Sequence, residues 1–402
     1  MPVSWWQKLT QLFGTGVQKT SILKQDAVTT TSRLFSARDI VLLRPLGRSG
    51  DDGKLTKPLS PTGKIEGHKG TIHHSDIIGR NARDIIKSTT GAPFRAHHVT
   101  LSDYVRLSRR LVTPIYPADA NLIVSLFDIH VQPSKPGSQP SPRYEILEAG
   151  TGHGALTLHL SRAINGGNPT RTSDQGEDEW RASRQAILHT VDISEKYSKH
   201  AEKIVTGFRQ GMYAGNVNFN VGSVSDWVQA EIESRGHSEP FLSNAFLDLP
   251  GLEDHLASVS SALLPDAKLV VFAPSITQIL ACFEKARKDR LPLILGQVVE
   301  LGTNGSSGGR EWDVRAVVPR DKLKKRSVSR TKAETAEEVS SEGSSSEADV
   351  VDNDISAEPV EPAEPAEQQS DVDEKLVCRP KVGDRITGGG FLAVFIKKGQ
   401  DG

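Results

Sequence analysis

Three alternate glycines and a carboxylate stand at the end of one apolar segment, in a pattern that could bind a ligand. In "EILEAGTGHGALTLHL" (145–160), Glu148 precedes Gly150, Gly152 and Gly154. Glycine adopts positive φ and leaves backbone amides uncovered, so a ligand can approach the start of the following helix. The G-x-G-x-G spacing differs from that of dinucleotide folds and phosphate loops. A tight turn with no ligand is the alternative.

Two carboxylates narrow the chemistry of such a ligand. Glu148 would repel a phosphate but could pair with a cation, such as an α-amino group or a sulfonium. Asp192 ends the next apolar segment, "HTVDIS", where an acidic residue accepts hydrogen bonds from ribose hydroxyls. Asp192 follows the glycine motif at about twice the usual distance of ~20 residues. A polar insertion at 165–181 accounts for the additional residues. The pattern suits S-adenosylmethionine better than NAD or ATP.

A third carboxylate is the candidate for catalysis. Asp248 follows the apolar segment in "NAFLDLPG", and open α/β sheets bind ligands outside the carboxyl ends of their strands. A carboxylate there can accept a hydrogen bond from an amine and stabilise a developing positive charge. The alternative is that Asp248 caps the helix that follows.

Alternating segments predict the scaffold that positions these residues. Strands are predicted over 144–150, 186–193, 217–223, 244–250, 267–275, 292–302 and 388–398, and helices over 118–129, 154–164, 195–210, 252–264 and 276–289. No helix is predicted between the strands at 217–223 and 244–250. Strand–helix alternation with continuous apolar strands indicates an α/β fold with a parallel sheet covered on both faces.

The rest of the chain divides by composition. Residues 39–110 contain short β-type runs broken by glycine, including "APFRAHHVTLSDYVRL" (92–107), and predict a small β-rich domain. The α/β domain follows at 111–326. Residues 327–375 are rich in Ser, Glu and Pro, which predicts a disordered insertion, and 376–402 contain the last strand of the sheet.

The first 38 residues carry five basic side chains and one acid, Asp26, with many Ser and Thr. Trp5, Trp6, Leu9, Leu12 and Phe13 recur at roughly helical spacing. This profile is typical of a mitochondrial transit peptide, and a merely disordered N-terminus is the alternative. We therefore expect the mitochondrial matrix as the location, with the nucleus as the alternative.

Composition limits the classes of function. The chain has 402 residues, of which 36% are hydrophobic, and no apolar run reaches the ~18 residues that span a bilayer. We expect a soluble protein with no membrane partner. Cys282 and Cys378 form neither a disulfide framework nor a zinc pattern.

Charge is distributed unevenly along the chain. Residues 334–374 hold 15 acidic and no basic side chains, which leaves 49 basic against 35 acidic residues elsewhere, a net charge of about +14. A basic body beside an acidic tract suggests a polyanionic partner, and ordinary solubilising charge is the alternative.

Four stretches resemble the tRNA (adenine-N1)-methyltransferases that modify position 58 in the T-loop. "GTIHHSDIIGR" (70–80) resembles the signature of that family's N-terminal β-domain, and "RLVTPIYPADANLI" (110–123) its cofactor-covering segment. "ILEAGTGHGALTLHLSRAI" (146–164) resembles the family's glycine motif, and "FLDLPGLEDHL" (246–256) the end of its catalytic strand. The first two stretches separate this family from other class I methyltransferases.

The resemblance implies a seven-stranded, Rossmann-like class I methyltransferase domain behind a small β-rich domain. It also implies a tetramer, either of four identical chains or with a non-catalytic partner subunit, and tRNA as the substrate. Asp248 is then the catalytic carboxylate for methylation of a ring nitrogen. The cofactor residues implied are Glu148, Gly150, Thr151, Gly152, Gly154 and Ala155 for the methionine part, Asp192 for ribose, Gly222 and Ser223 near adenine, and Tyr116 and Asp119 closing over it.

Two positions depart from the family pattern. Ser223 stands where an Asp is usual, and Leu-Pro-Gly follows Asp248 where the usual pattern is Asp-x-Pro-x-Pro-Trp. Other interpretations also stay open: a methyltransferase acting on protein or on mitochondrial ribosomal or messenger RNA, and a tRNA-binding partner subunit without catalysis.

The remaining polar motifs carry weaker predictions. The histidine pairs at 73–74 and 97–98 have no matching metal-ligand spacing, so we predict no metal site and expect these histidines at surface or RNA-facing positions. The basic run Lys322, Lys324, Lys325 and Arg326 could touch phosphate, or begin the disordered insertion.

Overall fold

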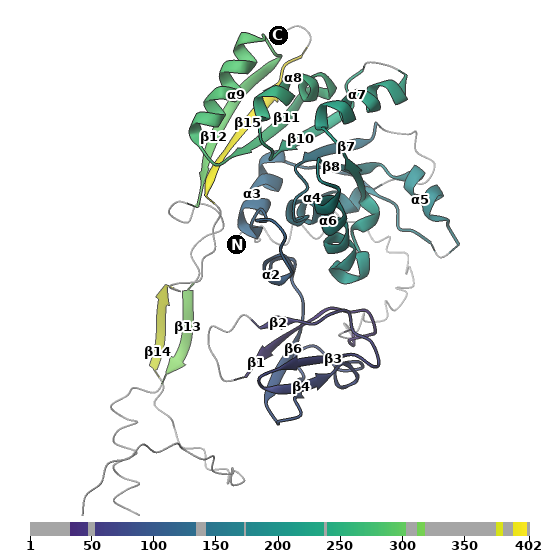
Figure 1. Ribbon diagram of the computed structural model, residues 1–402, viewed down its shortest axis with the longest axis vertical. Helices are drawn as coiled ribbons and strands as arrows, with labels where there is room; N and C mark the ends of the chain where they lie inside the picture. Colours follow the sequence, from purple (N-terminus) through teal and green to yellow (C-terminus); the bar gives the residue numbers. More distant parts are fainter. Residues whose placement is uncertain are drawn as a thin grey trace, which may run out of the picture. The chain divides into compact units, whose positions relative to one another are not determined.

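The computed structural model describes residues 33–46, 53–133, 142–172, 174–236, 239–302, 312–317, 375–380 and 389–399 (Figure 1). The proposed transit peptide up to residue 32, the basic run at 322–326 and the acidic tract at 334–374 lie outside these residues. Contacts divide the chain into two units, one formed by residues 1–299 with 390–402 and the other by 300–389. None of the described helices is long and apolar enough to cross a bilayer.

The first part of the larger unit is a small antiparallel β-structure. One sheet has the order β2-β1-β6-β5, formed by Lys54–Leu55, Val41–Pro45, Pro93–His98 and Ile85–Lys87. A second sheet pairs β3 (Lys64–Gly67) with β4 (Gly70–His73), and a 3-10 turn, η1 (His74–Asp76), follows. Phe35 packs into the core of this structure beside Val41 and Ile77, so the small domain begins before residue 39.

His74 corrects the prediction for the histidine pairs. Its side chain is buried, and Nδ1 accepts a hydrogen bond of 3.1 Å from the backbone N–H of Ser60. The residue therefore packs inside the small domain, whereas His73 and His98 are exposed.

A sheet of seven strands forms the second part of the unit and confirms the predicted α/β fold. Its order is β12-β15-β11-β10-β7-β8-β9. These strands are Leu293–Leu301, Gly390–Lys397, Leu263–Ala273, Leu242–Leu247, Tyr144–Ala149, Ala186–Asp192 and Val217–Val221. Pairing is parallel from β11 through β10, β7 and β8 to β9. One predicted feature is wrong, because β15 runs antiparallel to β11, with Val270 opposite Val394.

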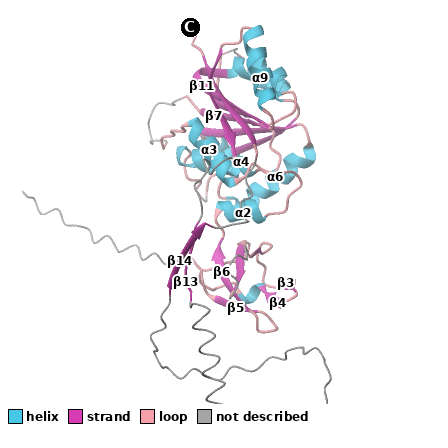
Figure 2. Cartoon of the chain, turned by 90° about the vertical axis from the view of Figure 1, so that its left-hand side faces the viewer, coloured by secondary structure: helices cyan, strands magenta, loops and turns pink. Residues whose placement is uncertain are grey.

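Helices cover both faces of this sheet, as Figures 1 and 2 show. α3 (Pro117–Phe127), α4 (Ala155–Ile164) and α6 (Glu195–Gly207) pack together on one face. α7 (Val224–Arg235), α8 (Leu252–Ala262) and α9 (Ile276–Lys288) pack on the other. The 3-10 turns η2 (Asn165–Gly167), η3 (Phe208–Gly211) and η4 (Ala214–Asn216) connect elements at the far ends of the strands.

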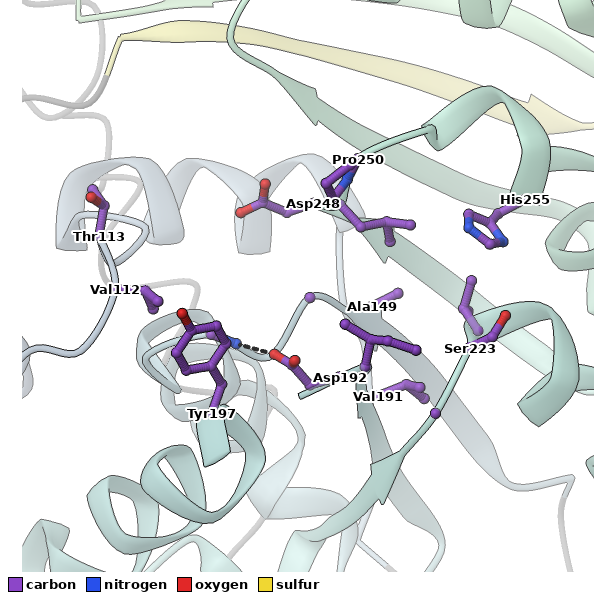
Figure 3. A pocket seen from close by; sticks show the side chains of 16 residues that line it. Val112, Thr113, Ala149, Val191, Asp192, Tyr197, Ser223, Asp248, Pro250 and His255 are labelled. Atoms are coloured by element: carbon purple, nitrogen blue, oxygen red, sulfur yellow. Dashed lines mark hydrogen bonds between the residues drawn. The ribbon is translucent and has the colours of Figure 1, made fainter. Parts of the chain in front are cut away.

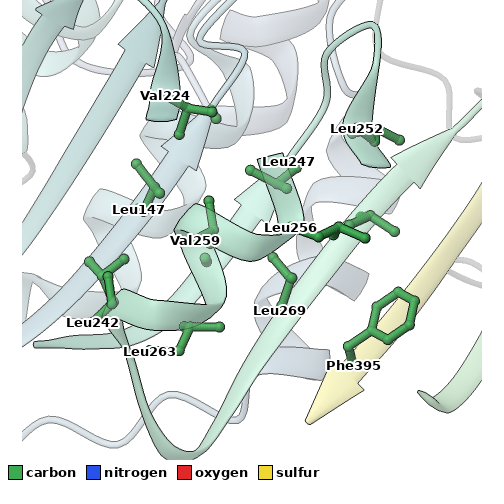
Figure 4. Close-up of a cluster of buried hydrophobic side chains, with 14 of the residues drawn as sticks. Leu147, Val224, Leu242, Leu247, Leu252, Leu256, Val259, Leu263, Leu269 and Phe395 are labelled. Atoms are coloured by element: carbon green, nitrogen blue, oxygen red, sulfur yellow. The ribbon is translucent and has the colours of Figure 1, made fainter. Parts of the chain in front are cut away.

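An extensive apolar core lies between the sheet and the second group of helices (Figure 4). Leu147, Leu247 and Leu269 from three neighbouring strands meet Leu256 and Val259 of α8. Burying such side chains contributes roughly 1.5–3 kcal/mol each. This packing anchors α8 beneath the loop that carries Asp248.

Three helices were not expected from the sequence. α2 (Leu101–Leu107) lies in a predicted β-type run, and Thr100 caps it by accepting a hydrogen bond of 3.0 Å from the N–H of Asp103. α5 (Glu177–Ser183) lies in the predicted polar loop, where buried Trp180 donates to the carbonyl of Pro169. α7 fills the interval without a predicted helix. Tertiary contacts override weak local patterns here.

An ionic cluster lies within the sheet, away from the glycine loop. His189 Nε2 lies 2.7 Å from Glu145 Oε2, and Arg235 donates to both oxygens of Glu145. Burial alone would raise the pKa of Glu145, but these two partners outweigh it and lower the pKa to about 2. Each buried polar group is thereby satisfied.

The smaller unit contains one described pair of strands. β13 (Trp312–Val317) pairs antiparallel with β14 (Lys375–Pro380), and Trp312 lies opposite Pro380.

The core position of β15 leads to a stability prediction. Phe395 is fully buried between β11 and the helices, so Phe395→Ala is expected to lower the free energy of unfolding by about 3–5 kcal/mol. Urea unfolding of the full chain measures this. Leu280→Ala, at an exposed position of α9, is the control and should change stability by less than about 0.5 kcal/mol. Equal effects of the two substitutions would contradict the assignment of β15 to this core.

Candidate active site

A pocket of about 590 Å³ opens at the carboxyl ends of the central strands (Figure 3). It lies where the chain order of the strands reverses, between β7 and β10, which is the usual ligand site of open α/β sheets. The residues that line it are Val112, Thr113, Ala149, Gly150, Gly152, Val191, Asp192, Ile193, Tyr197, Gly222, Ser223, Val224, Asp248, Leu249, Pro250 and His255. Most of the wall is apolar, with a few polar groups that converge on the cavity.

Backbone hydrogen bonds hold the strand ends together along the floor of this pocket. The N–H of Gly150 donates to Val191 (2.9 Å), and the N–H of Asp248 donates to Ala149 (2.9 Å). The N–H of Gly222 donates to the carbonyl of Asp192 at 3.0 Å. Gly150, Gly222 and Asp248, which are far apart in the sequence, thus occupy fixed positions at the same edge of the sheet.

The glycines of the loop have separate structural reasons. Gly150 has φ +91°, and a Cβ there would collide with the carbonyl oxygen of Asp248. Gly154 has φ +82°, and a Cβ would come within 3.1 Å of Ala201 on α6. Gly152 has φ +52°, with Val112 as the nearest side chain at 3.4 Å. Gly150 and Gly154 allow close packing, and Gly152 leaves the loop backbone open to the pocket.

Asp192 organises the loop as well as lining the pocket. Its Oδ2 accepts a hydrogen bond of 2.9 Å from the N–H of Gly152, and Oδ1 accepts one of 2.8 Å from the N–H of Ser194. Each carboxylate oxygen has further acceptor capacity, so both can also accept from hydroxyl groups of a ligand.

Asp248 lies half-buried on the wall of the pocket, at the end of β10. Burial raises the pKa of its carboxyl group to about 6. The following helix α8 has Gly251 as its N-cap, with no side-chain cap hydrogen bond. The geometry therefore favours a role in the pocket over the capping alternative.

Glu148 lies behind the glycine loop instead of in the pocket wall. It is buried, and its Oε2 accepts a hydrogen bond of 2.7 Å from Thr157 of α4. Burial, reinforced by the like charges of Asp248 and Asp192, raises its pKa to about 8. At neutral pH the group is mostly protonated, so in this arrangement it braces α4 against β7, and a direct contact with a cationic ligand stays a prediction.

The structure brings together part of the predicted cofactor set. Gly150, Gly152, Asp192, Gly222 and Ser223 line the pocket together with Asp248. The predicted residues outside the wall are Glu148, Thr151, Gly154, Ala155, Tyr116 and Asp119.

The predicted residues outside the pocket wall are held there by different contacts. Thr151 is buried and its Oγ1 lies 2.6 Å from that of Thr190. The ring of Tyr116 lies under the guanidinium of Arg110 at 5.6 Å. Asp119 is buried in the first turn of α3.

Sequence reasoning did not name ten residues of the wall, among them Val112, Thr113, Tyr197 and His255. Val112 and Thr113 lie in the 110–123 stretch that was singled out, but on its extended part before α3. Two histidines contact the residues just before this stretch: His200 Nε2 lies 3.0 Å from the carbonyl of Arg109, and His153 Nε2 lies 3.4 Å from Ser108 Oγ. His153 is buried, and burial lowers its pKa to about 4, so it acts as a neutral packing group.

The fit of Gly150 against Asp248 leads to a second stability prediction. Gly150→Ala forces a methyl group into the carbonyl of Asp248 at a positive φ, so it is expected to lower the free energy of unfolding by about 1–3 kcal/mol. Gly166→Ala, at a position with open space around it, is the control. Thermal unfolding of both variants measures the difference. An unchanged melting temperature for Gly150→Ala would show that the loop backbone is not constrained as described.

Comparisons with known proteins found relatives that are similar to this chain in sequence. No family model matches the chain. Over 256 residues the chain is 29% identical to a tRNA (adenine(58)-N(1))-methyltransferase, TrmI, from Thermus thermophilus, which covers 64% of this chain and 82% of the relative. It is 23% identical over 214 residues to the tRNA (adenine(57)-N(1)/adenine(58)-N(1))-methyltransferase TrmI of Methanocaldococcus jannaschii, covering 51% and 67%.

Solved structures share the fold. A SAM-dependent O-methyltransferase from Thermotoga maritima aligns with a TM-score of 0.54 and 15% identity, covering 91% of this chain and 95% of that one. The tRNA (m1A58) methyltransferase TrmI from Aquifex aeolicus aligns with a TM-score of 0.50 and 17% identity, covering 92% and 100%. The chain therefore has the class I methyltransferase fold and is a homologue of the tRNA (adenine(58)-N(1))-methyltransferases.

Proposed function

We propose that this protein transfers a methyl group from S-adenosylmethionine to N1 of adenine 58 in the T-loop of tRNA. The observation that carries the proposal is the position of Asp248. Its carboxyl group lies on the wall of a pocket that also contains the glycine loop and Asp192. The homologous proteins named above carry this activity in their names.

The residues present fit S-adenosylmethionine. A volume of about 590 Å³ lies within the range of small-molecule pockets, which combine apolar walls with a few polar groups. The open backbone at Gly152 would face the methionine part, Asp192 would accept from the ribose, and the Gly222–Ser223 turn would lie near adenine. S-adenosylmethionine supplies, when bound, an electrophilic methyl group on a sulfonium.

Asp248 has the chemistry that methylation of adenine N1 requires. N1 is a neutral nucleophile, so its methylation leaves a positive charge on the base. An ionised carboxylate at this wall accepts a hydrogen bond from the exocyclic amine and stabilises that charge as it develops. The enzyme needs alignment and electrostatic stabilisation, with no covalent nucleophile.

Product analysis tests the proposal directly. Purified full chain is incubated with labelled S-adenosylmethionine and unmodified tRNA, and nucleosides are analysed. We expect N1-methyladenosine, and its absence from a transcript in which adenine 58 is replaced by guanine. Cofactor binding without methyl transfer to tRNA would favour a required partner subunit or another RNA or protein substrate. Absence of cofactor binding would favour the non-catalytic partner subunit.

The raised pKa of Asp248 predicts the pH dependence of the reaction. Because the pKa is about 6, the carboxyl group is mostly ionised at pH 7 and becomes protonated below pH 6. The rate of methyl transfer is expected to fall about tenfold per pH unit below that value. Asp248→Asn should reduce kcat by about 10²–10³-fold and remove this acid limb. A variant that keeps the wild-type pH profile would exclude Asp248 from the chemical step.

We also propose a tetramer and a mitochondrial location. The tetramer, with identical chains or with a partner subunit, rests on the resemblance to the family. The location, with the nucleus as the alternative, rests on the basic, Ser- and Thr-rich composition of residues 1–38. Mass measurement of the purified chain tests the first, and import of the full chain into isolated mitochondria tests the second.

A further inference from the structure

His255 is a pocket residue that neither the glycine motif nor the catalytic role of Asp248 explains. It lies on the first turns of α8 and lines the cavity together with Ser223 and Val224. Figure 3 shows His255 and Ser223 at one end of the pocket, with Val112 and Tyr197 at the other. The imidazole ring and the Ser223 side chain are therefore the polar groups that Figure 3 labels at this end of the cavity.

A neighbouring helix fixes the orientation of this ring. His255 Nδ1 lies 2.8 Å from Oγ of Ser225, in the first turn of α7. Ser225 follows the Gly222–Ser223 turn by two residues, so the hydrogen bond ties the histidine to that turn. Among the residues that the structure describes, Nε2 has no hydrogen-bond partner. The tie at Nδ1 leaves Nε2 available to a ligand.

The apolar side chains of the pocket suit a flat ring. Val191, Ile193 and Val224 are among the residues that line the pocket, and 78% of Ile193 is exposed although the residue is apolar. A purine would cover this surface and offer its polar edge to a group on the rim. The side chain of Ser223 makes no cap hydrogen bond and is the N-cap residue of α7.

We propose that His255 reads the 6-amino group of the cofactor's adenine. With Nδ1–H donating to Ser225 Oγ, Nε2 is an acceptor, and it accepts a hydrogen bond from that amino group. Ser225 is the positioning residue, because its hydroxyl group holds Nδ1 and aims the ring. This inference rests on the proposed function, since it assumes that the pocket binds S-adenosylmethionine.

Binding measurements separate recognition of the amino group from general stability. The probes are S-adenosylhomocysteine and its purine-riboside analogue, which lacks the 6-amino group, and calorimetry gives Kd for the full chain. Wild type should bind S-adenosylhomocysteine about 10-fold more tightly than the analogue, as expected for the loss of one hydrogen bond. His255→Ala should bind both equally, with a Kd near the wild-type value for the analogue. His130→Ala, at a highly exposed histidine, is the control and should keep the preference.

Each outcome decides the inference. A His255→Ala variant that keeps the 10-fold preference overturns it. If that variant does not fold, Ser225→Ala decides, because it removes only the tie at Nδ1: a reduced preference supports the inference, and an unchanged one overturns it. If wild type binds neither probe, the proposed function fails instead. If wild type binds both equally, the pocket holds the cofactor but His255 does not read its amino group.

Discussion

The close approach of Gly150 to the carbonyl of Asp248 is the constraint on which the rest of the site depends. No side chain fits between these two backbones, so the loop after β7 and the loop after β10 lie side by side. One loop carries the candidate cofactor-binding amides and the other the candidate catalytic carboxylate. The distance between the glycine loop and the loop that carries Asp248 is thus set by a contact between backbones, in which the side chain of Asp248 takes no part.

Hydrogen bonds extend this constraint across the sheet. Asp192 holds the N–H of Gly152 with one oxygen and that of Ser194 with the other. Its backbone carbonyl holds Gly222. A single residue thereby connects the ends of β7, β8 and β9, and a ligand that spans these strands meets a rim already in position. Such preorganisation lowers the entropic cost of binding.

The three carboxyl groups of the site differ in how deeply they are buried and therefore in their charge near neutral pH. Glu148 is buried behind the loop with a pKa of about 8, and Asp248 is half-buried with a pKa of about 6. Asp192 is held by two backbone N–H groups. Near neutral pH the deepest group is mostly neutral and braces the scaffold, while Asp248 is mostly charged and faces the pocket. Acidic residues of similar type thus acquire different tasks because desolvation penalises only the charged form.

The sequence by itself determined the class of fold and the main pocket residues. Apolar segments of the right length between glycines and carboxylates specify parallel strands, and the carboxyl ends of such strands must meet at one edge. Gly150, Asp192 and Asp248 could therefore be identified without coordinates. The helices at 101–107, 177–183 and 224–235 could not, because buried contacts such as that of Trp180 with Pro169 stabilise them more than local pattern does.

Only the tertiary structure decided which neighbours of these residues face the cavity. Glu148 and Asp119 turn inward into the scaffold, whereas Val112, Tyr197 and His255 reach the pocket from a linker and two helices. No spacing in the sequence relates His255 to Ser225, which lies thirty residues earlier. Their contact exists because α7 and α8 pack on the same face of the sheet. Helix packing is a property of the whole core, and for that reason the sequence indicated Gly222 and Ser223 at this end of the site but not His255.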